Sequence, residues 1–207
     1  MKEGLFITLE GVEGAGKTTL VDFIENLLVK VGHNVVKTRE PGGTKIGEQI
    51  REILLKNENN ELSDDTELLL IFAARAQHIK EVIIPSLSSG KIVLCDRFTD
   101  ASYAYQGGGR GIDESRINLL EKWVQSDLRP DLTILFDLDV TLGLERTKKR
   151  SKSDRFEEEK IVFFEKVRRI YLKRAEDEPK RFRIINAELP IERVKEELTT
   201  IFEDFIC

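Results

Sequence analysis

Cysteine is scarce in this chain of 207 residues, which contains only two, and long hydrophobic runs are lacking. Cys95 lies in a short apolar run and Cys207 is the last residue, so no disulfide framework is predicted and a reducing compartment is favoured. No apolar run approaches the roughly 18 residues of a membrane span. The amino-terminal apolar stretch is broken by Glu10 and does not form a secretory signal. We therefore expect a cytoplasmic protein without a membrane partner.

An excess of positive charge is lacking as well. The formal net charge is −5 at pH 7, which argues against a protein that coats nucleic acid. The length fits a single domain spanning residues 1–207, or one domain with a small mobile insert. A chain of this length can bury roughly 70% of its unfolded surface, so its core needs no disulfide or metal.

Short apolar runs rich in β-branched residues alternate with helical patterns along the chain. After the first run, the helical pattern repeats from Leu20 to Val31 and stops at Gly32. The runs IVLC and TILF lack in–out alternation, as expected for strands that are buried on both faces. We therefore predict an α/β fold, with a parallel sheet flanked by helices on both faces. Its predicted strands lie at 5–10, 34–38, 92–96, 133–139 and 182–186.

The first predicted strand leads into the stretch LEGVEGAGKTTL, which contains the pattern G-x-x-x-x-G-K-T. The flanking strand and helix are the context that a phosphate-binding P-loop requires. Its backbone N–H groups and the helix N-terminus face phosphate, its lysine reaches the β- and γ-phosphates, and its threonine hydroxyl binds Mg²⁺. The alternative is a glycine-rich turn with a chance lysine. The predicted phosphate-binding residues are Gly11, Val12, Glu13, Gly14, Ala15, Gly16, Lys17, Thr18 and Thr19.

Charged residues follow two more of the predicted strands. Arg39 comes directly after 34–38. Asp96 ends the run at 92–96, and Arg97 follows it. Ligands of open α/β sheets bind at the carboxyl ends of the strands, where a guanidinium suits a second phosphate. Asp96 is placed to bind Mg²⁺ through water or to orient an acceptor. Arg39 could instead be a solvated residue of a surface turn.

Aromatic and polar residues with helical spacing provide candidates for a nucleoside pocket. In FAARAQH, Phe72 and Arg75 lie one turn apart, where a ring and a guanidinium could stack on a flat base and bond its edge. Such a phenylalanine is more often core and such an arginine more often part of a salt bridge. Tyr103, Tyr105 and Gln106 precede a glycine run, which suits a nucleoside pocket or a mobile loop.

The segment ERTKKRSKSDRFEEEK, residues 145–160, is too polar for the core. A solvated helix face is the default for such a charge cluster. Phosphoryl transfer, however, needs cations that close over the γ-phosphate. A mobile flap at about 146–157 could supply them from Arg146, Arg150 and Arg155.

A P-loop alone is compatible with switch GTPases, motor ATPases and small kinases. The guanine-reading pattern N-K-x-D is absent, and the chain lacks the added length of a motor. A kinase for a deoxynucleoside or for UMP remains one alternative. A nucleotide-dependent switch that binds a protein partner without turnover remains another.

Five motifs in order resemble the thymidylate kinase family: EGVEGAGKTT, TREPGGT, FAARAQH, DRF…AYQGGGR and DRFE, from residue 10 to about residue 157. The resemblance implies a P-loop fold with a five-stranded parallel sheet and a homodimer. It also implies phosphorylation of dTMP to dTDP by ATP and Mg²⁺, in dTTP biosynthesis. The apolar positions Leu68, Leu69, Phe72, Ile79 and Ile83 could supply a helical contact face for the dimer.

The resemblance also assigns roles in the acceptor site. By position, Phe72 stacks on thymine and Arg75 bonds the base. Ser102 and Gln106 fall where contacts with the base edge are expected, and Tyr105 lies beside the sugar 2′ carbon and disfavours ribose.

Phosphate and adenine contacts follow from the same matching. Arg39 and Arg97 match residues that hold the dTMP phosphate, and Arg146 matches a flap residue near adenine. Some family members carry an arginine in the P-loop, whereas this chain has Gly14 there and Arg150 in the flap. Glu13 is then expected on the acceptor side, near the sugar 3′-hydroxyl or a hydrated Mg²⁺.

The expected catalytic set is drawn from these residues. Lys17, Arg97 and Arg150 neutralise charge as it develops, and Asp96 organises the metal's water shell or the acceptor. Thr18 and Asp96 are the expected metal-binding residues.

Overall fold

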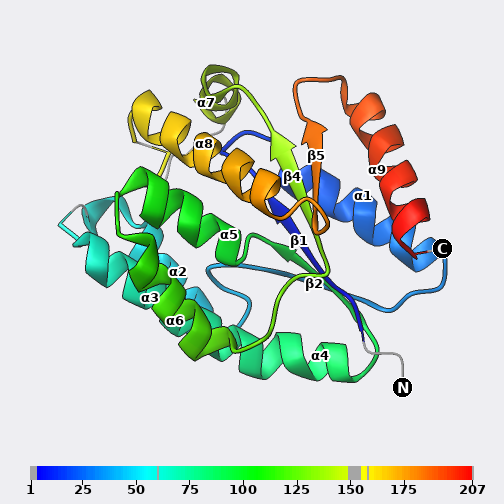
Figure 1. Ribbon diagram of the computed structural model, residues 1–207, viewed down its shortest axis with the longest axis horizontal. Helices are drawn as coiled ribbons and strands as arrows, with labels where there is room; N and C mark the ends of the chain where they lie inside the picture. The colour runs from blue at the N-terminus through cyan, green and yellow to red at the C-terminus, as the bar shows by residue number, and fades with distance from the viewer. Residues whose placement is uncertain (1–3, 60, 149–154, 158, 207) are drawn as a thin grey trace.

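The computed structural model describes residues 4–59, 61–148, 155–157 and 159–206. Within these residues, five parallel strands form one sheet in the order β2-β3-β1-β4-β5 (Figure 1). The strands are β1 (Phe6–Glu10), β2 (Val35–Arg39), β3 (Ile92–Asp96), β4 (Leu132–Asp137) and β5 (Phe182–Asn186). Each coincides with a predicted run to within two residues at either end, so the predicted α/β fold is confirmed.

Burial explains why the central strands lack alternation. All five residues of β1 are buried, as are the first five of β4, because both faces of the sheet are covered by helices. The edge strand β2 has no fully buried residue and contributes little to the core.

Helices fill the connections between these strands. No helix of the described residues is both long and apolar enough to cross a membrane. The α-helices are α1 (Lys17–Lys30), α2 (Lys45–Leu55), α3 (Asp64–His78), α4 (Ile84–Ser88), α5 (Thr99–Ser102), α6 (Glu114–Gln125), α7 (Val140–Lys148), α8 (Ile161–Asp177) and α9 (Ile191–Ile206). Asn57–Asn59 forms a 3₁₀ turn, and Ile79–Ile83 and Tyr103–Gly109 are π-helical.

Local sequence sets several helix starts. Ser63 caps α3 by accepting from Thr66 N at 3.2 Å, and acidic residues occupy its first turn. Thr44 caps α2 by accepting from Gly47 N at 2.9 Å, and Asp113 caps α6 by accepting from Ser115 N at 2.7 Å. These caps begin the helices that surround the carboxyl edge of the sheet.

The helices form a layer on each face of the sheet. In Figure 1, α8 crosses in front of the strands while α1 lies behind them, with α9 beside α1. The register pairs Leu9 of β1 with Asp96 of β3, and Arg39 of β2 with Asp96. The ends of β2 and β3 and the loop that follows β1 therefore meet at one edge.

Candidate active site

The loop after β1 wraps around the start of α1. Gly14 and Gly16 have left-handed backbones, with φ of 74° and 83°. Lys17 Nζ donates to Gly11 O at 2.9 Å and to Val12 O at 3.2 Å, so the lysine lies across the loop. Burial, with a smaller effect of Arg97, lowers the pKa of Lys17, whereas Asp96 and Glu13 oppose that shift.

Backbone contact with α7 accounts for a glycine at position 14. A Cβ on Gly14 would lie 2.2 Å from Gly143 O, and a Cβ on Gly143 would lie 2.5 Å from Glu13 O. An arginine at position 14 would therefore separate the loop from α7. Sequence reasoning did not single out Gly143.

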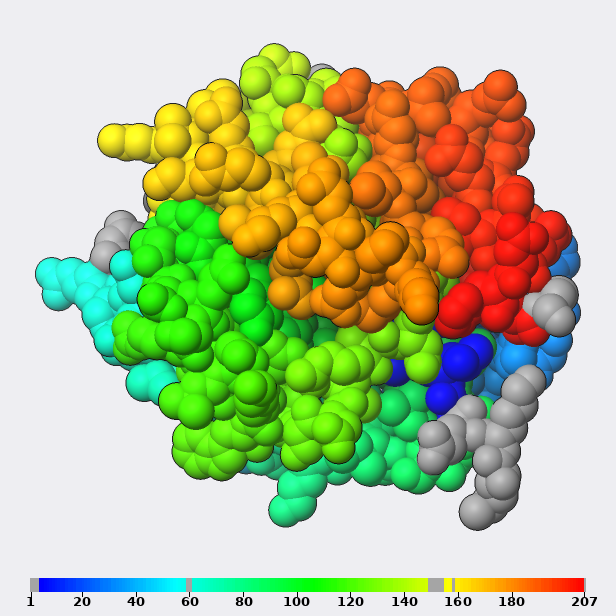
Figure 2. Space-filling view, in the orientation of Figure 1, coloured from blue at the N-terminus to red at the C-terminus, as the bar shows by residue number. Residues whose placement is uncertain are grey.

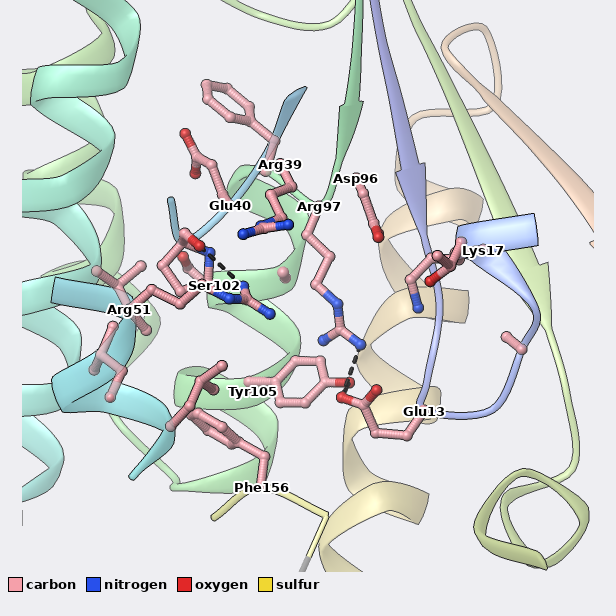
Figure 3. Close-up of a pocket in the computed structure, with 18 of the residues that line it drawn as sticks. Glu13, Lys17, Arg39, Glu40, Arg51, Asp96, Arg97, Ser102, Tyr105 and Phe156 are labelled. Carbon is pink, nitrogen blue, oxygen red and sulfur yellow. Dashed lines mark hydrogen bonds and ion pairs between the residues drawn. The ribbon is translucent and has the colours of Figure 1, made fainter. Parts of the chain in front are cut away.

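A cavity of about 240 Å³ opens beside this loop (Figure 3). Its walls come from the loop, the ends of β2 and β3, helices α2 and α3, and the π-helical segment 103–109. The structure brings these predicted residues together in its lining: Glu13, Gly14, Ala15, Gly16, Lys17, Thr18, Arg39, Arg75, Asp96, Arg97, Ser102, Tyr105 and Gln106. Gly11, Val12, Thr19 and Arg146 lie outside that lining.

Glu13 projects from the loop toward Arg97 (Figure 3). It accepts from Arg97 Nη2 at 2.8 Å and from Tyr105 Oη at 3.1 Å. Burial raises the pKa of Glu13, but Arg97 and Lys17 more than offset that effect, so the pKa lies below its usual value. The carboxylate charge is thus directed to Arg97 and not to the phosphate-binding N–H groups.

Arg97 is held in a conformation that is rare for arginine. Its φ is 69°, in the left-handed region, while its N donates to Leu9 O at 2.9 Å. The guanidinium carbon lies 4.6 Å from the centroid of the Tyr105 ring. Left-handed non-glycine residues concentrate at functional sites, which agrees with its place at the cavity.

Asp96 offers an oxygen to the same cavity. Among the described residues, its Oδ1 is buried without a hydrogen-bond partner, although Asp96 and Thr18 both line the cavity. An orphaned carboxylate oxygen beside a threonine at the loop fits Mg²⁺, which takes few protein ligands and keeps water and phosphate oxygens. No cluster of three or more acidic, histidine or cysteine ligands occurs in the described part of the chain.

Arg75 and its neighbours line the cavity away from Lys17. Arg75 donates to Glu40, to Phe98 O and to Ser102 Oγ, and Gln106 Nε2 donates to Glu67 Oε1 at 2.9 Å. Arg75 is 1% exposed. It forms a salt bridge with Glu40 and also lines the cavity, so the two interpretations of this arginine do not exclude each other.

Phe72 is one of the buried residues of helix α3. It is buried in a cluster with Leu68, Tyr103 and Ile117 and does not line the cavity. Its ring centroid lies 4.6 Å from the Arg75 guanidinium carbon. The ring therefore supports Arg75, since helix α3 turns position 72 toward the interior.

The remaining predicted cations have distinct environments. Arg39 is half exposed and pairs with Glu48 at 2.8 Å. Arg146 of α7 donates to Ala187 O at 3.1 Å and Gly14 O at 3.5 Å, next to the P-loop. Arg150 lies outside the described residues. Arg155, one of the cations offered for the flap, does not lie on a solvated helix face, because it is 7% exposed, donates to Leu54 O and pairs with Glu67.

Several cavity residues escaped sequence reasoning. Glu40 and Pro41 sit inside the quoted TREPGGT motif, and Arg51 Nη1 donates to Pro41 O at 2.9 Å. Phe156 belongs to DRFE and also lines the cavity. The motifs drew attention to these segments, but nothing in the sequence distinguished these particular residues from ordinary turn or surface residues.

The fold and the cavity define a P-loop phosphate-binding protein with a second cationic site beside the loop. The thymidylate kinase family model matches residues 9–198. A thymidylate kinase of Pseudomonas savastanoi pv. phaseolicola is 54% identical over 203 residues, covering 98% of this chain and 97% of that protein. One from Vesicomyosocius okutanii is 53% identical and covers 98% and 99%. A crystal structure of thymidylate kinase from Ehrlichia chaffeensis superposes with a TM-score of 0.80 at 35% identity, covering 97% and 99%. This chain belongs to the thymidylate kinase family.

Proposed function

We propose that this chain transfers the γ-phosphoryl group of ATP to dTMP, giving dTDP for dTTP biosynthesis. The observation that carries the proposal is one cavity lined by a P-loop, two acceptor-side arginines and a buried Arg75. A P-loop provides for the donor phosphates, the arginines suit a second phosphate, and Arg75 suits the edge of a base.

In this proposal the residues of the loop hold the donor. Backbone N–H groups of Gly14–Thr18 and the Lys17 ammonium bind the β- and γ-phosphates. Arg146 lies between the loop and Ala187, where it can contact adenine. Thr18 and Asp96 would hold Mg²⁺, which would supply positive charge to neutralise the phosphates.

Arg97 and Arg39 hold the acceptor phosphate in line with the donor. Glu13 keeps Arg97 in place through an ion pair of 2.8 Å, and Tyr105 stacks beneath its guanidinium. Direct in-line transfer needs positioning and charge neutralisation and no covalent enzyme intermediate. Arg150 is proposed as the additional cation, because Gly14 leaves the P-loop without an arginine.

The acceptor nucleoside lies against Arg75, Ser102, Tyr105 and Gln106. Tyr105 Oη is fixed by Glu13, so its ring is positioned to exclude a ribose 2′-hydroxyl. Phe72 acts in this proposal through Arg75, against which its ring packs.

An ADP-release assay with a panel of nucleoside monophosphates tests the proposal. We expect dTMP to exceed UMP by at least about 10²-fold in kcat/KM, because base and sugar are read together. Equal use of UMP would contradict the acceptor assignment. ATP binding without ADP release for any monophosphate would favour the switch protein instead.

We also propose a homodimer, through a different face from the predicted one. Leu68, Phe72, Ile79 and Ile83 are buried inside the chain, so only Leu69 of the predicted face is available. Leu69 on α3, with Leu119 and Trp123 on the neighbouring α6, are the large exposed apolar residues of this region. A contact between two copies would cover them.

A further inference from the structure

Three acceptor atoms on two segments of the chain fix the Arg75 guanidinium. Its Nε donates to Glu40 Oε2 at 2.6 Å, and its Nη2 donates to Phe98 O at 3.1 Å and Ser102 Oγ at 3.0 Å. Among the described residues, the buried Nη1 has no hydrogen-bond partner. The three occupied N–H groups therefore fix the guanidinium and leave only the two N–H donors of Nη1 without a partner.

Glu40 connects Arg75 to a histidine one turn along the same helix. Its second oxygen, Oε1, lies 2.9 Å from His78 Nδ1, and Glu40 is 5% exposed. An ionised carboxylate can only accept hydrogen bonds, so Nδ1 carries the proton and donates. Both oxygens of Glu40 are thus bonded to α3.

His78 also forms a hydrogen bond with strand β2. Its Nε2 lies 2.6 Å from Thr38 Oγ1, and its side chain is fully buried. A hydrogen bond therefore joins the ring of His78 to the Thr38 hydroxyl. Thr38, His78 and Glu40 form one chain of hydrogen bonds that ends at Arg75.

Gly43 allows the turn to pack directly over this chain. Its φ is 77°, and a Cβ there would lie 2.6 Å from both His78 Nε2 and Thr38 Oγ1. A side chain at position 43 would displace that hydrogen bond. Glu40 and Gly43, both in the motif TREPGGT, therefore keep His78 of FAARAQH in its hydrogen-bonded position.

A fixed guanidinium distinguishes bases better than a mobile one. Arg75 lines the cavity. An unpaired N–H donor of its guanidinium can pair with a keto oxygen, whereas an amino group would place donor against donor. Sites built to hydrogen-bond one such group reject the analogue that lacks it far more strongly than apolar pockets do. The discrimination depends on the guanidinium being held in place.

We propose that Thr38, His78 and Glu40 are positioning residues that orient Arg75 and thereby set the preference for a keto over an amino pyrimidine. The inference rests on the proposed function, because Arg75 reads a base only if the cavity takes a pyrimidine monophosphate. None of the three residues is placed against the reacting atoms.

The test uses two acceptors, dTMP and 5-methyl-2′-deoxycytidine 5′-monophosphate. They share sugar, phosphate and ring methyl group and differ only along the base edge. Their ratio of kcat/KM, measured in one preparation, does not depend on how much of the enzyme is folded. We expect Glu40→Gln and His78→Phe to lower this ratio at least about tenfold and Thr38→Val to lower it less, with the ATP Kd within about twofold of the parent.

Matched controls are available within the chain. Glu52→Gln changes an exposed carboxylate on α2, and His33→Phe changes the other histidine of the chain. Both controls should keep the parent ratio. In imidazole NMR spectra, dTMP should shift the resonances of His78 and leave those of His33 unchanged, and Glu40→Gln should abolish that shift.

The outcomes separate the inference from the proposed function. An unchanged ratio in Glu40→Gln and His78→Phe overturns the inference, whether or not Arg75→Ala loses it. If both buried variants fail to fold, an unchanged ratio in Thr38→Val overturns it. If the parent protein itself uses dTMP no better than UMP, the proposed function fails.

Discussion

At the scale of single residues, Glu13 shows how an anion-binding loop accommodates a carboxylate. Its oxygen Oε1 contacts both Arg97 and Tyr105, which line the cavity beside the loop. Burial raises the pKa of Tyr105 well above its usual value, so the hydroxyl remains a donor to Glu13. The negative charge of Glu13 is therefore paired with the guanidinium of Arg97.

Glu13→Gln should impair use of dTMP and leave ATP binding largely intact. The amide keeps the shape but removes the charge-assisted bond to Arg97, which is worth roughly 1.5–3 kcal/mol. We expect kcat/KM for dTMP to fall by about 10- to 10²-fold. The deciding quantity is the ATP Kd without acceptor. A loss there comparable to the loss for dTMP would place Glu13 on the donor side.

Glu10 is a second carboxylate close to the loop, and it is fully buried. Its oxygens accept from Phe98 N at 2.8 Å and from Tyr171 Oη at 2.7 Å. Burial, and then the charge of Asp100, raises the pKa of Glu10 from 4.5 to about 7. Because Phe98 follows Arg97, this carboxyl supports the backbone of the acceptor-side arginine.

Glu10 should make folding pH-dependent in a defined window. Between pH 4.5 and about 7 the folded chain holds this proton more tightly than the unfolded chain, so its contribution to stability falls as the pH rises. Glu10→Gln imitates the protonated form. Urea unfolding at fixed salt should show the free energy of unfolding of the parent falling relative to the variant, by on the order of 3 kcal/mol across this window. A difference that stays constant with pH would mean that Glu10 is not held protonated.

At the scale of secondary-structure elements, the contact between the P-loop and α7 depends on Gly14. Gly14→Ala should weaken ATP binding at least about tenfold, because its Cβ would lie 2.2 Å from Gly143 O and would move the loop. Gly111→Ala is the control, since Gly111 has a φ of 80° and no atom within 4 Å of a Cβ. Both variants carry the cost of a left-handed alanine, roughly 1–2 kcal/mol. Calorimetric titration with ATP should separate them; equal ATP affinities would show that the contact is unimportant.

The strands were predictable because each carries its own signal. Unbroken apolar runs predicted β1, β3 and β4, and the P-loop pattern placed the start of α1. The apolar spacing of α3 did not distinguish its faces, because Leu68 is buried and Leu69 is 57% exposed. For the same reason the spacing left open whether Phe72 belongs to the core or to the cavity. Contacts between distant segments, such as Arg155 with Glu67, depend on the tertiary fold and leave no local pattern.

At the scale of the whole molecule, three of the large exposed apolar side chains outline a face on α3 and α6. Leu119 and Trp123 lie one turn apart on α6 and are 68% and 78% exposed. Helices α3 and α6 lie side by side, so Leu69 extends the same face (Figure 1). Figure 2 shows the surface of α6 at the lower left, away from the carboxyl terminus. Such a face is suited to a second copy of the chain.

The single tryptophan of the chain provides a direct test of this dimer. If α3 and α6 form the contact, Trp123 becomes buried, so its emission should move to longer wavelength on dilution while light scattering shows the mass falling from two chains to one.

Trp123→Asp should weaken the dimer about 30-fold or more, because a central tryptophan of an interface contributes roughly 2–4 kcal/mol. Val31→Asp, at a residue that is 63% exposed beyond the end of α1, should leave the dimer intact. A parent protein with the mass of one chain at micromolar concentration contradicts the dimer. A Trp123→Asp variant that stays dimeric places the contact on another face.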